Sequence, residues 1–447
     1  MCILLRRSAQ SLKRKCLQKM DCRIFLFVFL STFWHLSEQC MISNDQRSEE
    51  SKLLTMMVNS IDVLPYPNPN VLMALRLARD HHLGKEKKLL QLLKEDAENN
   101  NISGPNFSSG KVALYVLSIM GSCENPAKIP TQAGHLNLVE VLSHKLQDEF
   151  ENITNSNFPA ANNYDISLSV LALCMANGQL PPASVEYLCN AAVTTTSNGM
   201  LSVDAAAVAV LGLHCVDKDR KNSAIQASMA SLVKQILDAQ TTDGTIGSIY
   251  TTGLAMQALS VTSDLYFATS WDCGLTLKKL VNEVANGNFS DPTAASHIIP
   301  PIEGKTYLDL NKLNCSADRD NLTMTDASSP VYPAITVIFS VQDGINNTFS
   351  YSTSVTVPFA SSLLTVMQKA KEMQPDEFSF ETKDTPFGTK VVKIHNLESN
   401  TDDGIYWLFQ EDGELIRQGV NNYIVQDSST IVATFSVLNS TQWKISA

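Results

Sequence analysis

An acidic residue near the middle of the chain is the side chain best placed to do chemistry. Asp204 opens the segment SVDAAAVAVLGLHC, which is otherwise apolar and is predicted to form a helix. A carboxylate in the first turn of a helix is stabilised by the helix dipole, and the same carboxylate can accept hydrogen bonds from a ligand. The segment alone leaves both interpretations open.

Patterns typical of catalysis or metal binding are absent from the sequence. The 447 residues contain no GxSxG, HExxH, Walker or GxGxxG motif, and the 8 histidines show no metal-ligand spacing. The paired acids Asp402-Asp403 and Glu411-Asp412 fall in predicted hairpin turns, where carboxylates are common. We therefore predict no catalytic residue and no metal site. The alternative, a glycan-processing enzyme, needs two acids that converge on one cleft, and only Asp204 is well placed.

Composition and the N-terminus narrow the class of protein. A formal net charge of −11 argues against a nucleic-acid partner, and 44% hydrophobic residues allow a large core and two domains. Residues 24–36, IFLFVFLSTFWHL, form an apolar run that is too short to span a bilayer comfortably. We interpret residues 1–37 as a secretory signal region, so the mature protein is expected to be extracellular, without membrane insertion.

Secretion gives the cysteines a structural role. Those after the leader contain no CxxC pair that would suggest zinc, and their number is odd, so one thiol is expected to remain unpaired. Cys174 and Cys215 end two apolar segments at matching places, so a bridge between them would join neighbouring hairpins. The cysteines concerned are Cys40, Cys123, Cys174, Cys189, Cys215, Cys273 and Cys315.

A helical repeat organises the first two thirds of the chain. Apolar segments recur at spacings of roughly 40–55 residues, and amphipathic segments separate them. Apolar helices inside and amphipathic helices outside predict a closed α6/α6 toroid of six helix hairpins over residues 38–315. Its mouth is formed by the turns that enter the inner helices. The apolar segments are residues 71–78, 112–120, 166–175, 205–213, 253–261 and 293–299.

The last third of the chain has a different period. Residues 316–333 are polar and poor in helix signals, and we predict a linker there. Over residues 334–447 the apolar period becomes two, with one helix at 363–373, which predicts a small α+β domain. The fold class is therefore multi-domain and mainly α, with the second domain expected to act as a lid over the toroid mouth.

Three sequence segments carry a resemblance to a known family. They are TTDGTIGSIYTTGLAMQALSVT at 241–262, GKTYLDL at 304–310, and the C-terminal strands with Tyr406-Trp407-Leu408-Phe409 and Gln418-Gly419-Val420. From about Cys40 to these strands the chain resembles the cobalamin (vitamin B12) transport proteins, which include gastric intrinsic factor, haptocorrin and transcobalamin. The resemblance implies a secreted, glycosylated and monomeric carrier that holds cobalamin between its two domains for uptake through a cell-surface receptor.

The resemblance also implies roles for particular residues. It pairs Cys40 with Cys273, Cys123 with Cys315 and Cys174 with Cys215, which leaves Cys189 unpaired. Within it, Asp204 becomes an acceptor for cobalamin amides. Gln257 is more often a core amide and is retained only as a possible contact. The expected cobalamin-binding residues are Asp204, Tyr164, His297, Asn70, Lys111, Ser248, Gln257, Trp407, Phe409 and Ile416, and the expected glycosylation sites are Asn101, Asn106, Asn152, Asn288, Asn321, Asn346 and Asn439.

Several positions depart from the family pattern. Lys111 and His297 stand where the family tends to have glutamine, and Ser248 stands where intrinsic factor has an acid. Transcobalamin-like chains place a histidine three residues before the aspartate, and this chain has Leu201 there. These changes alter the charge at the expected rim and remove an imidazole from the expected cobalt side.

Overall fold

The computed structural model describes residues 40–63, 67–99, 102–103, 107–132, 134–156, 163–193, 201–289, 291–324, 334–358, 361–385, 388–400, 405–416, 419–420 and 423–437. The predicted signal region and the sequons at Asn101, Asn106 and Asn439 lie outside these residues, and the side chain of Asn152 is likewise not described. Asn288, Asn321 and Asn346 are exposed. None of the helices described is both long enough and apolar enough to cross a bilayer.

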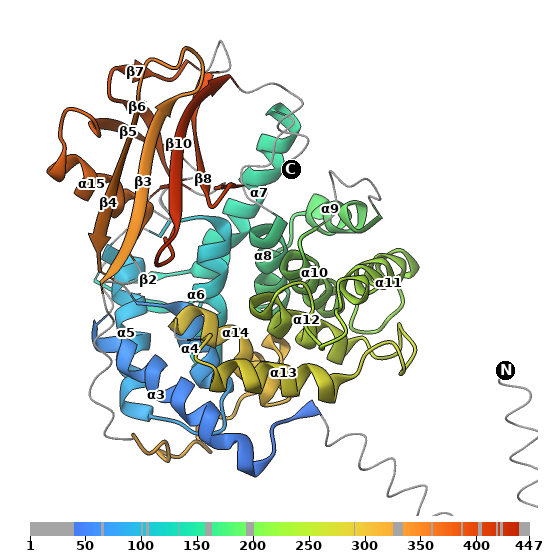
Figure 1. The fold of residues 1–447 in the computed structure, drawn as a ribbon. Helices are drawn as coiled ribbons and strands as arrows, with labels where there is room; N and C mark the ends of the chain where they lie inside the picture. The colour runs from blue at the N-terminus through green and yellow to red at the C-terminus, as the bar shows by residue number, and fades with distance from the viewer. Residues whose placement is uncertain are drawn as a thin grey trace, which may run out of the picture.

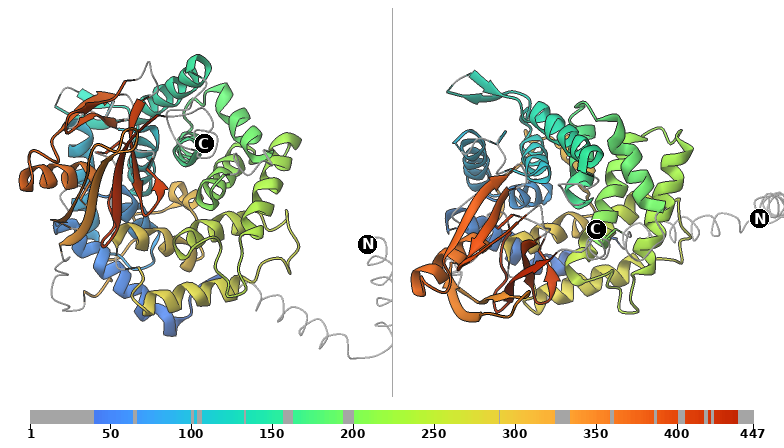
Figure 2. Two further views of the ribbon diagram at one scale, coloured as in Figure 1. Left: turned by 45° about the horizontal axis from the view of Figure 1, so that its top comes forward. Right: turned by 90° about the horizontal axis from the view of Figure 1, so that it is seen from above.

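Helical hairpins form a closed ring in the first part of the chain (Figures 1 and 2). Each inner helix packs against the next, and the last packs against the first. The inner helices are α4 (Pro69–Leu77), α6 (Ser109–Gly121), α8 (Asn163–Met175), α10 (Val203–Val216), α12 (Ile249–Val261) and α14 (Pro292–Ile302). The outer helices are α3 (Arg47–Val63), α5 (Leu83–Asn99), α7 (Leu138–Ser156), α9 (Pro182–Val193), α11 (Ser223–Asp238) and α13 (Cys273–Ala285). The predicted α6/α6 toroid is confirmed.

The helix order follows from composition and from capping residues. The inner helices are apolar nearly all round, so only a fully enclosed position buries them. Side chains that accept backbone N–H groups fix where several of them begin: Asn68 for α4, Ser108 for α6, Ser248 for α12 and Asp291 for α14. A short hairpin of β1 (Ile129–Thr131) and β2 (Gly134–Leu136), which the sequence did not predict, precedes α7.

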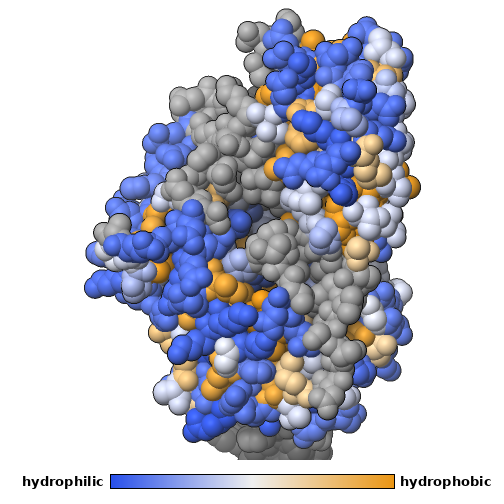
Figure 3. Space-filling view, turned by 90° about the vertical axis from the view of Figure 1, so that its left-hand side faces the viewer, coloured by the Kyte–Doolittle hydropathy of each residue, from blue (hydrophilic) through white to orange (hydrophobic). Residues whose placement is uncertain are grey.

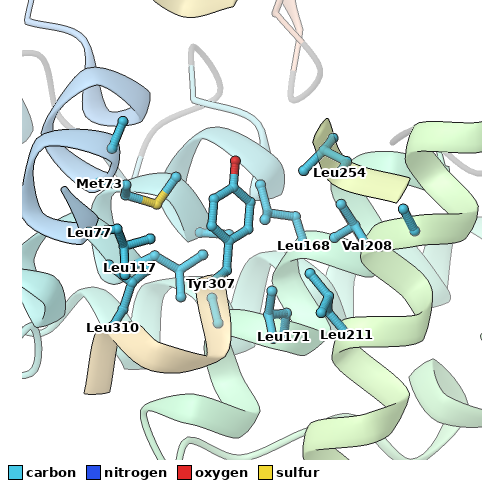
Figure 4. Packing of buried hydrophobic residues seen from close by; sticks show 14 of the residues in the cluster. Met73, Leu77, Leu117, Leu168, Leu171, Val208, Leu211, Leu254, Tyr307 and Leu310 are labelled. Carbon is cyan, nitrogen blue, oxygen red and sulfur yellow. The ribbon is translucent and has the colours of Figure 1, made fainter. Parts of the chain in front are cut away.

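A 3-10 helix fills the centre of the ring. This segment, η3 (Tyr307–Lys312), contacts α4, α6 and α10, and it buries Tyr307 and Leu310. In Figure 4, Tyr307 stands between Met73, Leu77 and Leu117 on one side and Leu168, Val208 and Leu254 on the other. A second 3-10 helix, η2 (Asn44–Gln46), precedes α3.

Three disulfides close the ring. They join Cys40 to Cys273, Cys123 to Cys315 and Cys174 to Cys215, and Cys189 is free. These are the pairs that the resemblance implies. The contacts of the ring continue past the predicted boundary at residue 315. Arg76 forms an ion pair with Asp318, His81 Nε2 lies 3.6 Å from Asp318 Oδ1, and the backbone N–H of Leu322 donates to the carbonyl of His81.

The second domain has a hydrophobic core of its own. Its main sheet has the order β4-β3-β10-β8-β9, in which β3 and β10 are parallel and the other neighbours antiparallel. One face is covered by α15 (Leu363–Met373) and by a smaller sheet of β5 (Phe380–Thr385), β6 (Gly388–Ile394) and β7 (Leu397–Glu398). The main strands are β3 (Ile335–Asp343), β4 (Ser350–Val357), β8 (Ile405–Glu411), β9 (Glu414–Leu415) and β10 (Thr430–Val437). In Figures 1 and 2 this domain stands next to α5 and α6.

Candidate functional site

The inner helices all begin at the same end of the ring. Asn68, which caps α4, donates from Nδ2 to Thr293 Oγ1 of α14 at 2.8 Å, and Gly110 of α6 lies against Asp165 of α8. At the other end, the Cys174–Cys215 bridge joins the last turns of α8 and α10. We call the end where the inner helices begin the mouth. Because helix N-termini carry partial positive charge, the mouth favours ligand groups that accept hydrogen bonds as well as acidic side chains.

A group of polar side chains gathers at the mouth around the ring axis. Tyr164 and Asp165 come from α8, Asp204 from α10 and His297 from α14, and Tyr307 reaches them from η3. We call these five residues the polar cluster. All except Tyr307 are partly exposed. These four residues therefore border solvent at the mouth, and we call the solvent-accessible space that they border the recess.

The cluster residues perturb one another's ionisation. Burial raises the pKa of Tyr164 well above its usual range, and the neighbouring Tyr307, Asp204 and Asp165 raise it further. Burial lowers the pKa of His297, and the charge of Asp204 only partly opposes this effect. Tyr164 is therefore a neutral phenol at pH 7 and His297 a neutral imidazole, so both can donate and accept hydrogen bonds.

Asp165 has a different role within the cluster. Burial raises its pKa to about 6, and the Ser108 hydroxyl at the start of α6 opposes the rise. Asp165 also lies so close to Gly110 that a Cβ built there would be 2.1 Å from Asp165 Oδ1. Asp165 therefore ties the start of α8 to the start of α6.

Asp204 has a carboxylate without a hydrogen-bond partner among the described residues. It is half-buried in the first turn of α10, and no described residue donates a hydrogen bond to it or forms an ion pair with it. The Tyr164 hydroxyl and the His297 ring also have no hydrogen-bond partner among the described residues. A structural cap would be expected to bond to backbone N–H groups. The three side chains instead present free hydrogen-bonding atoms to the recess.

The other residues expected from the first domain lie in three different settings. Asn70, in the first turn of α4 at the mouth, has a buried Oδ1 without a hydrogen-bond partner in the described chain. Ser248 is exposed at the mouth and caps α12, with its Oγ accepting from Thr251 N at 3.2 Å. Lys111 points away from the cluster, since its Nζ lies 4.2 Å from the Phe107 ring centre and it feels the charge of Asp96 on α5. Burial lowers the pKa of Lys111.

Gln257 is a core residue. Its side chain is fully buried, and its Oε1 accepts a hydrogen bond of 2.9 Å from the backbone N–H of Tyr307. The structure therefore supports the core-amide interpretation, in which Gln257 acts on the site through Tyr307.

The residues expected from the second domain differ in their exposure. Trp407 and Phe409 were expected to pack over a ligand, but they are only 6% and 8% exposed. They share one face of β8, and α15 and the smaller sheet cover that face; Trp407 Nε1 donates to Leu397 O at 3.2 Å. Ile416 is partly exposed beside the same core.

Two cluster residues were missing from the predicted site. Asp165 follows Tyr164 directly, and Tyr307 lies within the GKTYLDL motif, so the sequence contained both signals. The contact between Asp165 and Gly110 joins two helices far apart in the chain and could not be read from either segment.

A closed helical ring with free polar groups in its mouth, followed by a small α+β domain, defines a two-domain ligand-binding protein. Comparison with known proteins specifies the class further. A family described as eukaryotic cobalamin-binding protein matches residues 22–335, and a domain of unknown function matches residues 360–437.

Similar proteins cover nearly the whole chain. It is 34% identical to human transcobalamin-1 over 435 residues, 92% of this chain and 97% of that one. It is 29% identical to human cobalamin binding intrinsic factor over 434 residues, 92% of this chain and 99% of that one. The crystal structure of haptocorrin in complex with Cbi (cobinamide) matches with a TM-score of 0.61 and 29% identity, over 90% of this chain and all of that one.

This chain belongs to the eukaryotic cobalamin-binding protein family. The relatives are binding and transport proteins and not enzymes, which rules out the glycan-processing alternative.

Proposed function

We propose that this protein binds cobalamin at the mouth of the ring and carries it outside the cell. The observation that supports this proposal is the set of free hydrogen-bonding atoms on Asp204, Tyr164 and His297 in one recess. Cobalamin carries amide groups around its corrin edge. An ionised carboxylate is a strong acceptor for amide N–H groups, and a half-buried one binds them with less competition from water.

The first domain supplies complementary groups for such an edge. Asp204 accepts from amide N–H groups in this proposal, and the partly exposed side chain of Asn70 lies at the same end of the ring. The neutral phenol of Tyr164 and the neutral imidazole of His297 donate to amide carbonyls. Ser248 is exposed where α12 begins and adds a hydroxyl group to the rim of the mouth. Lys111 faces Phe107 and the charge of Asp96, so a direct contact between its ammonium and the ligand is not part of this proposal.

The second domain covers the opposite face of the ligand in this proposal. Because the smaller sheet and α15 bury Trp407 and Phe409, these two side chains shape β8 and do not contact the corrin. Ile416 and the half-buried outer face of β8, with Tyr406 and Leu408, remain available for that contact. Two domains with separate cores can approach one ligand from two sides.

The carrier role extends the proposal beyond binding. We place the N-terminal apolar run in a cleaved secretory signal, and we place glycans on the exposed Asn288 and Asn346. Delivery to cells then requires a surface receptor that recognises the loaded protein.

A binding titration tests the proposal. The secreted protein is titrated with cobalamin and with cobinamide, which lacks the lower base, and free ligand is separated by ultrafiltration. We expect tight binding at one ligand per chain, and no retention of cobalamin would contradict the proposal. The lid is tested by expressing residues 38–324 and 334–447 separately, where each part should bind weakly and the mixture more tightly; tight binding by the first part alone would rule out a lid.

A further inference from the structure

The apolar residues of the first domain are concentrated inside the ring, so contacts between the inner helices determine where the polar cluster lies. On the face shown in Figure 3, the described residues mix hydrophilic side chains with small hydrophobic patches, whereas the inner helices bury most of their residues. One of the contacts between inner helices involves a residue of the polar cluster itself. It joins Gly253 of α12 to His297 of α14.

Gly253 lies in the second turn of α12, where glycine is unfavourable for the helix. Alanine is a better helix former in a helix interior, so a glycine there usually has a packing reason. A Cβ built on Gly253 would lie 2.4 Å from the carbonyl oxygen of His297, 3.1 Å from its carbonyl carbon and 3.2 Å from Ile298 Cγ2. The first distance is too short for any real contact. The His297 carbonyl therefore fits against α12 only because residue 253 has no side chain.

The same carbonyl lacks its usual donors within α14. In an α-helix the oxygen of His297 would accept from the N–H of residue 301, and in a 3-10 helix from that of residue 300. Both positions are proline, and proline has no N–H. The prolines remove the donors that would hold this oxygen in the helix, and Gly253 provides the space that it occupies.

We infer that Gly253 is a positioning residue for the ligand site, which holds His297 where its imidazole can reach a bound corrin; this inference rests on the function proposed above. The carbonyl group and the side chain of His297 share one Cα, so fixing the carbonyl also fixes the direction of the imidazole. With a methyl group at residue 253, lengthening the 2.4 Å contact to an ordinary 3.4 Å would move α14 by about 1 Å. Hydrogen-bonded atoms lie about 2.7–3.2 Å apart, so such a shift would separate His297 from a corrin amide carbonyl.

NMR of the ligand-free secreted protein tests the position of His297 directly. Histidine is labelled with ¹³C at Cε1, and the His297→Ala variant identifies the His297 ring signal. We expect Gly253→Ala to shift this signal, because α12 and α14 must separate. Gly212→Ala is the matched control: its Cβ would lie 3.3 Å from Ser167 O and 3.5 Å from Leu171 N, so it crowds α10 against α8 and should leave the His297 signal in place. An unchanged His297 signal in a folded Gly253→Ala variant would overturn the inference.

A double-mutant cycle separates positioning from stability. We expect Gly253→Ala to weaken cobalamin binding about tenfold, which corresponds to the loss of one hydrogen bond, and by less than about twofold in the His297→Ala background. Its effect in urea denaturation should be equal in both backgrounds, because His297→Ala keeps the carbonyl that Gly253 accommodates. An affinity loss that persists without the imidazole would show that Gly253 acts only on the fold. Absence of cobalamin binding in wild type would contradict the proposed function, and the NMR result would stand apart from it.

A variant of α14 tests the same contact from the other side. Pro301→Ala supplies an N–H that can bond to the His297 carbonyl and draw it back into the helix. We expect this variant also to shift the His297 signal and to weaken cobalamin binding only when the imidazole is present. If Gly253→Ala does not fold, Pro301→Ala takes its place in both measurements, and an unmoved His297 signal there would overturn the inference.

Discussion

Gln257 Oε1 accepts a hydrogen bond of 2.9 Å from the backbone N–H of Tyr307, and this bond attaches the segment at the centre of the ring to helix α12. Both residues are buried, so water cannot replace either partner. Tyr307 lies beside Tyr164 in the polar cluster. Gln257 therefore positions Tyr307 of the polar cluster from inside the core.

Replacing Gln257 by leucine should destabilise the fold. The change leaves the Tyr307 N–H buried without an acceptor, which costs about 1–3 kcal/mol in the free energy of unfolding. Urea denaturation followed by circular dichroism measures the loss. Gln91→Leu is the surface control, because Gln91 is exposed on α5 and bonds only to Glu95; its effect should stay within about 0.5 kcal/mol. Equal stability of Gln257→Leu and wild type would show that the bond is dispensable.

Gly110 should not tolerate a side chain. A Cβ at this position would lie 2.1 Å from Asp165 Oδ1 and 2.8 Å from Asp165 Cβ, so α6 and α8 would have to separate. We expect Gly110→Ala to destabilise the protein by about 1–3 kcal/mol and to weaken cobalamin binding. Gly84→Ala is the matched control, because its nearest atoms, in His82, are 3.7 Å away and alanine favours the helix by roughly 0.5–1 kcal/mol. A neutral Gly110→Ala variant would contradict the close approach of the two helices.

The unfolding free energy should depend on pH through Glu50. This residue shares an arginine with Glu303, since Arg47 Nη1 donates to Glu50 at 2.8 Å and to Glu303 at 3.0 Å. Burial raises the pKa of Glu50 to about 9 from its ordinary value of 4.5, and the adjacent Glu303 adds to the rise. A raised pKa means that the stabilisation is complete below the unfolded-state value and is lost as the pH rises from 4.5 towards 9.

Glu50→Gln keeps the neutral form at every pH. We expect its stability relative to wild type to increase between about pH 5 and pH 9, by more than about 1 kcal/mol. Glu49→Gln is the control, because Glu49 pairs with Lys52 at the surface, and its pH profile should follow wild type. Parallel profiles for Glu50→Gln and wild type would contradict the raised pKa of Glu50.

Asp204 should contribute directly to cobalamin affinity. Its carboxylate has no donor from the described protein, so removing it costs little in folding and removes a charge-assisted hydrogen bond to the ligand. We expect Asp204→Ala to weaken binding by about 1.5–3 kcal/mol, with an unchanged circular dichroism spectrum. Asp219→Ala, at an exposed acid paired with Lys221, should bind like wild type. Unchanged affinity of Asp204→Ala would return this residue to a purely dipole-stabilising role.

The ring could be predicted from the sequence because its signals are local. Apolar helices that alternate with amphipathic ones fix which helices lie inside, and the first-turn position of Asp204 fixes its end of the ring. The contacts that complete the site are not local. Gly110 and Lys111 are adjacent in the chain, yet a helix turns by about 100° per residue, so Gly110 faces α8 and Lys111 faces α5.

In the second domain, too, the contacts of a strand depend on elements distant in the sequence. Alternation correctly predicted that Trp407 and Phe409 share a face of β8. It could not show that α15 and the smaller sheet would cover that face, because those elements come from other parts of the chain. Whether these two residues contact the ligand therefore stays a prediction, and their burial in the second domain's core is the observation that stands against it.

The cobalt of bound aquocobalamin should keep water or another small ligand on its upper side. Leu201, at the position where transcobalamin-like chains have a histidine, is buried and offers no imidazole nitrogen. His297 is the other residue that could bind the cobalt, because it lies in the polar cluster. Burial lowers its pKa, which leaves a neutral imidazole nitrogen able to bind a metal. Asp204 lies beside His297, however, and we expect the imidazole to donate a hydrogen bond to a corrin amide carbonyl instead. The absorption spectrum of the aquocobalamin complex distinguishes the two cases. We expect no imidazole-type shift in wild type and the same spectrum in His297→Ala, and a shift in wild type that disappears in His297→Ala would show that His297 binds the cobalt.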